Sequence, residues 1–304
     1  MVNIVVLNYN DSKTTKRLVD SIERYNNIQT VVIVDNRSTD NSYLELCMHY
    51  SEHKKIIVLR SDKNGGYGYG NNYGLKYVKE ELGNNYVLIC NPDVLFPEET
   101  VNELECFLQQ NSDVAIVSPM MLNTENKKVY SCVWRIPTAI ESASLNSIFL
   151  SRFCSSFYYT RESFEHDTAM RVDCVAGSML LVDLDKFPNP AIYDEKMFLY
   201  CEETVLGIKV KQLGFHSYLL TNSTFVHAHS VSINKTYPKQ IQQYKLMWKS
   251  RLYMIKTYLA KSKREILYAY FARFETLMEK QIILLVRQIK KYTPIKTKKK
   301  GLSK

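Results

Sequence analysis

Short apolar runs rich in β-branched residues alternate with amphipathic segments along the first part of the chain. Strands are predicted over residues 4–7, 31–34, 56–59, 86–90 and 114–118. Between them, apolar residues recur at helical spacing over residues 13–25, 42–50, 70–82 and 97–110. Such alternation is typical of βαβ units, so it predicts an α/β fold with a Rossmann-like, mostly parallel central sheet and flanking helices.

The pattern changes further along the chain. One strand is predicted over residues 172–182, broken at Gly177, followed by a helix over 198–213 and a strand over 216–229. Beyond Pro238 only helical patterns occur, with a second helix predicted over residues 265–291. The first of these helices has one apolar face, made of Tyr244, Met247, Trp248, Leu252, Ile255, Tyr258 and Leu259. We therefore predict an α/β domain over residues 1–237 and C-terminal amphipathic helices with a basic tail over residues 238–304.

Positive charge is concentrated in that C-terminal part. The chain has 40 Lys and Arg against 31 Asp and Glu, a net charge of +9, and residues 245–304 alone hold 17 basic and 3 acidic residues. The end of the chain thus carries +14 and the rest −5, so nucleic-acid binding is not expected. Cationic helices with aromatic residues favour contact with an anionic membrane surface. The alternative is a helical appendage packed on the first domain, with its lysines in solvent.

Cysteine usage and the N-terminal run bear on location. The seven cysteines contain no C-x-x-C pair, which gives no sign of a zinc site or a disulfide framework and suits a reducing cytosol. The opening MVNIVVLNYN has no basic leader and predicts a strand rather than a signal peptide. No apolar run approaches the ~18 residues needed to cross a bilayer. We expect a cytoplasmic protein, with peripheral attachment to the inner face of the plasma membrane left open.

Polar residues follow the predicted strands, where a parallel sheet binds its ligands. Asn8 and Tyr9 follow the first strand, Asp35 the second, and Asn91 and Asp93 the fourth. An Asp at such a position often only caps the next helix. Two of them on either side of a glycine-rich loop favour a nucleotide site.

That loop, DKNGGYGYGNNYG, follows the third strand and holds half of the ten glycines. Glycine lets the backbone approach a ligand closely and supplies free amides at a helix N-terminus. The spacing G-x-G-x-x-x-G and the position after the third strand do not match a dinucleotide fingerprint. A plain glycine-rich turn is the alternative.

Two further groups of residues carry candidate chemistry. Glu202 and Glu203 begin a predicted helix, where acidic residues are common as complements of the helix dipole. His227 and His229 alternate on a predicted strand and point to one face, so one of them is a candidate to join Asp93 on a divalent cation. A structural role is the alternative for each residue taken alone.

In this order, the motifs VVLNYN, VIVDNRSTDNS, NGGYGYGNNYGL, YVLICNPDV, GSMLLV, FLYCEE and FVHAHSVS resemble glycosyltransferase family 2 over about residues 2–232. The nearest branch is the bacterial rhamnosyltransferase-like one, which builds cell-surface polysaccharides. The resemblance implies a GT-A fold, a nucleotide-sugar donor, a divalent metal (Mg or Mn), and inversion at the anomeric carbon. The acceptors in this family are often lipid-linked.

The resemblance also implies roles for individual residues. Leu7, Asn8 and Tyr9 would line the nucleotide pocket, and Asp35 would hydrogen-bond the base or ribose. Gly66 and Asn72 fall in the donor-contacting loop. Asn91 and Asp93 occupy the D-x-D motif with Asp93 as metal ligand, Glu203 falls on the catalytic carboxylate, and His227 on the histidine that closes the metal and diphosphate site. The chain departs from the family at Asn91, which replaces an Asp, at Glu203, which replaces a more usual Asp, and at Val205 and Lys209.

A mechanism follows from these residues. Sugar transfer with inversion is a single displacement that needs one carboxylate to take the proton of the acceptor hydroxyl and a counter-charge for the departing diphosphate. We hypothesise that Glu203 is this base and that Asp93 holds the metal. A sugar-phosphate nucleotidyltransferase is one rival, although its glycine- and basic-rich loop is expected after the first strand, where NYNDSK stands. A non-catalytic nucleotide- or glycan-binding module is the other.

Overall fold

The structure is a computed structural model that describes residues 1–165, 167–228 and 240–292. Its centre is a nine-stranded sheet with the order β3-β2-β1-β4-β10-β6-β11-β5, and β8 pairs with β11. The strands are β1 (Val2–Asn8), β2 (Ile28–Asp35), β3 (Ile56–Arg60), β4 (Tyr86–Cys90), β5 (Val94–Leu95), β6 (Val114–Leu122), β8 (Ala169–Val172), β10 (Met179–Asp183) and β11 (His216–His227).

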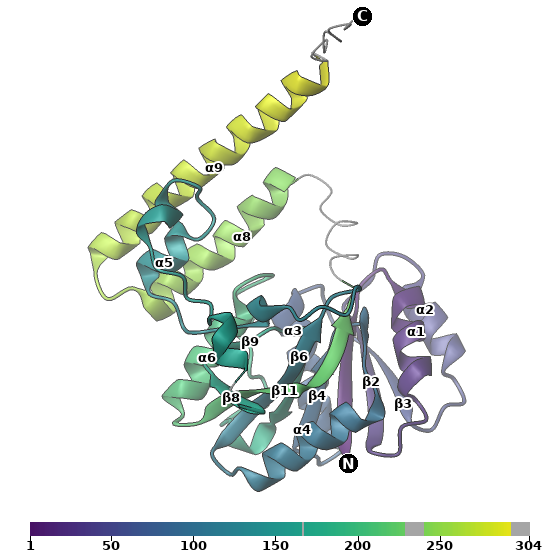
Figure 1. Ribbon diagram of the computed structural model, residues 1–304. Coiled ribbons are helices and arrows are strands. Elements are labelled where there is room, and N and C mark those ends of the chain that lie inside the picture. Colours follow the sequence, from purple (N-terminus) through teal and green to yellow (C-terminus); the bar gives the residue numbers. More distant parts are fainter. Residues whose placement is uncertain (166, 229–239, 293–304) are drawn as a thin grey trace, which may run out of the picture.

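Helices lie on both faces of this sheet (Figure 1). They are α1 (Ser12–Ile22), α2 (Ser42–His49), α3 (Tyr67–Glu81), α4 (Glu98–Gln110) and α6 (Glu202–Gln212). Helix α3 packs on β1 and β2, and α4 packs on β6 and β11. The predicted α/β fold with a Rossmann-like sheet and flanking helices is confirmed.

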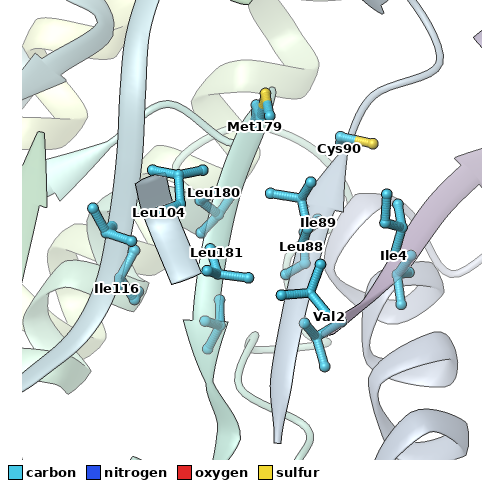
Figure 2. Packing of buried hydrophobic residues seen from close by; sticks show 14 of the residues in the cluster. Val2, Ile4, Leu88, Ile89, Cys90, Leu104, Ile116, Met179, Leu180 and Leu181 are labelled. Carbon is cyan, nitrogen blue, oxygen red and sulfur yellow. The ribbon is translucent and has the colours of Figure 1, made fainter. Parts of the chain in front are cut away.

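The core explains why the N-terminal strands read as continuous apolar runs. In β1, Val2, Ile4, Val5 and Val6 are all fully buried, because helices cover both faces of the parallel part of the sheet. Figure 2 shows β4 and β10 side by side, with Ile89 of β4 beside its partner Leu180 in the antiparallel register.

Two predicted elements differ in the structure. The strand predicted over residues 172–182 is interrupted: β9 (Cys174–Val175) pairs with β7 (Val133–Trp134) in a separate small sheet, and β10 enters the main sheet antiparallel to β4 and β6. Gly177 lies in the turn between them. The helix predicted from residue 198 begins only at Glu202, because Tyr200 and Cys201 have left-handed backbone conformations with φ of 74° and 73°.

The C-terminal helices form a second packing unit. They are α8 (Gln240–Met254), a π-helical turn (Ile255–Leu259) and α9 (Lys263–Tyr292), and they enclose a buried cluster with the short α5 (Ala139–Ser144). Trp248 is fully buried in that cluster, so the apolar face predicted for the first helix packs inward at this residue. The predicted boundary at residues 237–238 and the basic tail 293–304 lie outside the described residues. Among the helices of the described ranges, none is long and apolar enough to cross a bilayer.

Candidate active site

A cavity of about 490 Å³ opens beyond the carboxyl ends of β1 and β4. The segments that form it come from distant parts of the sequence and meet where a parallel sheet places its ligand site. Its walls include Leu7, Tyr9, Asn36, Asn64, Gly66, Tyr67, Asn91, Asp93, Gly177, Ser178, Phe198, Tyr200, Cys201, Glu202, Glu203 and His227.

One wall carries a carboxylate and an imidazole in contact. The Nε2 atom of His227 lies 3.2 Å from Oδ1 of Asp93, and both side chains are only about one-tenth exposed. The pairing of His227 with Val94, between β11 and β5, brings them together. A carboxylate oxygen and an imidazole nitrogen suit a divalent ion such as Mn²⁺.

These two residues fit a metal that is shared with a substrate. The described residues contain no cluster of three or more His, Cys, Asp and Glu side chains able to hold an ion. Ions such as Mg²⁺ are commonly held by one or two protein groups together with substrate phosphates. The pair therefore supplies part of a coordination sphere and leaves the rest to phosphate oxygens and water.

Asn91 reaches the same wall from the end of β4. Its backbone N–H donates to the carbonyl oxygen of Ser178 at 2.9 Å, which continues the pairing of β4 with β10. The amide of Asn91 lines the cavity but carries no charge, so Asp93 provides the carboxylate of this motif.

The glycine-rich loop is fixed to Phe198, which also lines the cavity. Gly66 has φ 91°, and a Cβ atom there would overlap the carbonyl oxygen of Phe198. That same oxygen accepts a hydrogen bond from the backbone N–H of Tyr67 at 2.9 Å, and the Tyr67 hydroxyl donates to the carbonyl oxygen of Gly177 at 2.6 Å. Only glycine allows this close approach at residue 66.

Glu203 stands in the first turn of α6, half-buried, with its carboxylate beside Gly177. A Cβ atom at Gly177 would lie 3.0 Å from Oε1 of Glu203 and 2.8 Å from the Tyr67 hydroxyl. Burial raises the pKa of Glu203, while its own backbone N–H and that of Gly177 act against the rise. A raised carboxyl pKa suits a general base that works near neutral pH.

Glu202 differs from its neighbour in exposure. Its side chain is buried, and burial followed by the charge of Glu203 raises the pKa of Glu202 well above its ordinary value. Protonation of Glu202 relieves the repulsion between the two adjacent carboxylates. Glu203 is therefore the one of the two better suited to accept a proton from a ligand in the cavity.

The wall formed by residues 198–203 is held from outside by the C-terminal helices. Ser250 donates to the carbonyl oxygen of Leu199 at 2.7 Å, and the hydroxyls of Tyr253 and Tyr258 donate to Oδ2 of Asp194 at 2.8 and 2.7 Å. These contacts were not predicted from the sequence, because helical periodicity identifies an apolar face and not the polar partners that reach across from it.

Asn8 and Asp35 do not line the cavity. Both are fully buried, and Nδ2 of Asn8 donates to Oδ2 of Asp35 at 2.9 Å. The other oxygen of Asp35 accepts the backbone N–H of Ser38 at 3.0 Å, in the turn that follows β2, whereas the N-cap of α2 is Asn41. Their neighbours Tyr9 and Asn36 face the cavity instead.

Asn72 is also absent from the cavity walls. It is fully buried and donates to the carbonyl oxygen of Tyr193 and to Oε1 of Glu195, both at 3.0 Å, while it accepts the backbone N–H of Tyr193 at 3.0 Å. This is a structural bridge between α3 and residues 193–195.

Seven of the ten predicted site residues thus line the cavity, and three do not. Those that line the cavity are Leu7, Tyr9, Gly66, Asn91, Asp93, Glu203 and His227, and those that do not are Asn8, Asp35 and Asn72. The candidate His229 lies outside the described residues. Tyr67 and Gly177 were missed, although the glycine-rich loop and the strand break each gave a signal at those positions.

Comparison with protein families and curated proteins gives consistent results. The sequence model of the family described as "Glycosyl transferase family 2" matches residues 3–168. The rhamnosyltransferase WbbL of Escherichia coli is 24% identical over 221 residues, which cover 70% of this chain and 78% of that protein. A low-salt glycan biosynthesis hexosyltransferase of Haloferax volcanii is 27% identical over 202 residues, or 66% of this chain. The chain spans only 59% of the length of that archaeal relative.

Solved structures share the fold at low sequence identity. The mannosyltransferase PcManGT of Pyrobaculum calidifontis, in complex with GDP-Man and Mn²⁺, has a TM-score of 0.54 and 14% identity and covers 96% of this chain and 81% of its own. TarS of S. aureus in complex with UDP has a TM-score of 0.52 and 15% identity and covers 87% of this chain and 68% of its own. The expected GT-A-type fold is confirmed.

Proposed function

This chain belongs to glycosyl transferase family 2, and on that premise we propose that it transfers a hexose from a nucleoside-diphosphate sugar to a hydroxyl group of a growing cell-surface polysaccharide. The donor is linked to UDP or dTDP, and the names of two relatives favour rhamnose as the sugar. A further relative, from Mycobacterium tuberculosis, is 24% identical over 212 residues, and its name, N-acetylglucosaminyl-diphospho-decaprenol L-rhamnosyltransferase, favours a lipid-linked acceptor. In this proposal residues 1–237 are the glycosyltransferase domain.

One observation carries the proposal: Glu203 and the Asp93–His227 pair lie on the walls of the same cavity. A half-buried carboxylate and a potential metal site are the two groups that transfer of a glycosyl unit from a diphosphate requires. The cavity lies at the carboxyl ends of the strands, where nucleotides bind to sheets of this kind.

The nucleotide would lie against Leu7, Tyr9 and Asn36, which follow β1 and β2. The buried contact between the neighbouring residues Asn8 and Asp35 fixes the ends of these two strands. The carboxylate of Asp35 does not line the pocket. The base and ribose would therefore be recognised mainly by Tyr9, by Asn36 and by backbone groups.

Asp93 and His227 would hold a divalent ion, Mg²⁺ or Mn²⁺, at the diphosphate. When bound, this ion supplies positive charge against the leaving diphosphate. Asn91 lines the same cavity and would act beside the ion as a neutral hydrogen-bonding group. PcManGT, which shares the fold, binds GDP-Man and Mn²⁺ together, and this supports the same combination of ligands here.

Glu203 would take the proton from the acceptor hydroxyl as that oxygen bonds to the anomeric carbon and the diphosphate departs. One base suffices for a single displacement, which inverts the configuration at that carbon. Glu202, buried and with a pKa well above its ordinary value, is unsuited to act as a second, nucleophilic carboxylate.

The test begins with ligand binding by the full chain. We expect a thermal shift with either UDP- or dTDP-sugars that depends on Mn²⁺ or Mg²⁺, because a ligand that binds the folded state raises its stability. Transfer to a polyprenyl-diphosphate-linked glycan is then followed by mass spectrometry. Glu203→Gln is expected to keep the thermal shift and lose transfer, while Glu80→Gln, an exposed position on α3, serves as control.

Three results would contradict the proposal. Full turnover by Glu203→Gln would show that Glu203 is not the base. The absence of any nucleotide-dependent shift in folded protein would favour a non-catalytic binding module. Release of pyrophosphate from a nucleoside triphosphate and a sugar phosphate would identify a nucleotidyltransferase.

A lipid-linked acceptor also gives the protein a reason to work at a membrane. We propose peripheral association of the C-terminal helices with the anionic inner face of the plasma membrane. The net charge of +14 over residues 245–304 supports it.

A further inference from the structure

Helix α9 is apolar on the side that faces away from the rest of the protein. Its inner side carries the small buried residues Ala269, Ala272 and Thr276, which pack toward α5 and α8. Its outer side carries large apolar residues that are 43–70% exposed. We call these residues the α9 stripe: Leu267, Tyr270, Phe271, Phe274, Met278, Ile282, Leu285 and Val286.

The stripe follows the helical period along the described part of α9. Apart from the adjacent pairs Tyr270/Phe271 and Leu285/Val286, its members recur at intervals of three or four residues, which places them on one face of the helix. From Leu267 to Val286 this face extends over about 30 Å at the usual rise per residue. Figure 1 shows the C-terminal half of α9 extending beyond the α/β body, away from α5 and α8.

A second group of exposed apolar side chains lies beside the stripe. Ile148, Phe149 and Phe153 are 50%, 55% and 74% exposed, and the rings of Phe149 and Phe153 contact each other edge to face at 5.3 Å. Glu279 of α9 accepts the backbone N–H groups of Ile148 at 2.7 Å and Phe149 at 3.0 Å. These bonds fix the loop to the flank of α9.

The exposed charges around this surface are mostly basic, whereas two of the acidic residues accept hydrogen bonds from backbone N–H groups of the protein. Glu279 binds the 148–149 backbone, and Glu265 accepts the backbone N–H groups of Lys261 and Ser262. The third acidic residue of residues 245–304, Glu275, is half-buried. By contrast, Arg152, Lys263 and Arg264 are exposed and form no ion pair with another described residue.

We propose that the α9 stripe and the apolar side chains of the 148–153 loop form a membrane-insertion face, with α9 lying parallel to the plane of an anionic bilayer. An apolar helix face bordered by cations is the pattern of helices that lie in a lipid interface. Contact with a second copy is disfavoured, because it would oppose two segments that each carry a net charge of +14. This inference names the surface through which the protein would contact the membrane. It rests on the proposed function only for the reason why the protein would bind a membrane at all.

The test reads vesicle binding alone, so its result is independent of transferase activity. The full chain is sedimented with vesicles of phosphatidylcholine alone and with vesicles containing about a third phosphatidylglycerol. The variant Phe271→Ser/Phe274→Ser removes two exposed rings of the stripe, and Phe149→Ser/Phe153→Ser removes those of the loop. The matched control is Leu44→Ser/Met48→Ser, which removes two apolar side chains that are 59% and 77% exposed on α2.

We expect wild type and control to bind the anionic vesicles, and the two test variants to bind at least about tenfold more weakly with unchanged thermal melting. A single Phe274→Trp substitution should give a blue-shifted emission on adding anionic vesicles. Undiminished vesicle binding by both test variants would overturn the proposal and would attribute vesicle binding to the basic tail. Equal binding to neutral and anionic vesicles would overturn the role of the cations. A wild-type dimer that becomes monomeric in Phe271→Ser/Phe274→Ser, without a loss of vesicle binding, would assign the stripe to an interface between copies.

Discussion

Ser250, on α8, donates a hydrogen bond to the main-chain carbonyl oxygen of Leu199, 2.7 Å away on the wall of the cavity. The next two residues after Leu199 are Tyr200 and Cys201. Their left-handed backbone conformations are unfavourable for residues other than glycine. Glu203 follows them closely, in the first turn of α6. The C-terminal helices therefore help to hold a strained segment that sets the position of the proposed base.

Removing this bond is expected to affect catalysis more than donor binding. Ser250→Ala should lower kcat several-fold and leave the donor KM unchanged, because the segment before Glu203 loses one of its outside contacts. The expected loss of unfolding free energy is about 1 kcal/mol. Steady-state kinetics and urea denaturation give both values.

The control is Ser21→Ala, since the Ser21 hydroxyl also donates to a carbonyl oxygen, that of Leu18, but on α1. Ser21 is exposed whereas Ser250 is buried, so Ser21→Ala should lose less stability than Ser250→Ala and should keep its kcat. A donor KM that rises in Ser250→Ala together with an unchanged kcat would contradict the positioning role.

The pH profile of transfer should report the environment of Glu203. Burial raises its pKa, and the base must be deprotonated to work. We therefore expect kcat/KM to fall as the pH drops, with the acidic limb centred above the ordinary Glu value of about 4.3. Glu203→Asp should retain weak activity. A wild-type profile in which kcat/KM does not fall at acidic pH would contradict the assignment of Glu203 as the base.

Glu202 should make the folded state sensitive to pH in a defined direction. Its folded-state pKa is raised, so the folded protein binds a proton more tightly than the unfolded chain does. The resulting stabilisation is complete below the unfolded pKa and is lost as the pH rises through the folded pKa. Glu202→Gln removes this dependence, so its stability relative to wild type should increase as the pH rises above the ordinary Glu value of about 4.3. Denaturation curves at several pH values test this, and a relative stability that decreases with pH would be the opposite of the expected sign.

Asn72 is expected to contribute to stability and not to donor affinity. Its side chain makes three hydrogen bonds to residues 193 and 195 in a fully buried position. Asn72→Ala should cost about 2–3 kcal/mol of unfolding free energy, because buried backbone groups of Tyr193 lose their partner. The donor KM should stay within about twofold in the protein that remains folded. Asn91→Ala is the contrasting variant, since that residue lines the cavity: it should raise the donor KM and leave thermal melting nearly unchanged.

The contrast between these two asparagines shows what the sequence can and cannot predict. Strand exits are predictable, because apolar runs end where polar residues begin, and this located Asn91, Asp93 and Tyr9 correctly on the cavity. Which side a residue faces within a helix or at the last position of a strand depends on packing partners far away in sequence. Asn72 thus pairs with Tyr193, and Asp35 with Asn8. The antiparallel insertion of β10 between β4 and β6 has the same origin, since local pattern does not specify strand order.

Gly66 offers a test of the close contact between the glycine-rich loop and the wall that leads to Glu203. Both Gly66 and Gly83 have positive φ, of 91° and 64°, but only at Gly66 would a Cβ atom meet another group, the carbonyl oxygen of Phe198. Gly83→Ala adds backbone strain alone and should cost about 1 kcal/mol of unfolding free energy while activity is kept. Gly66→Ala adds the overlap with Phe198 and displaces the acceptor of the Tyr67 N–H bond. It should therefore cost more than Gly83→Ala and lower kcat at least about tenfold, because the wall that carries Glu203 has to move. Equal stability and equal kcat in the two variants would mean that the loop and the wall separate without consequence, and the coupling between them would have to be abandoned.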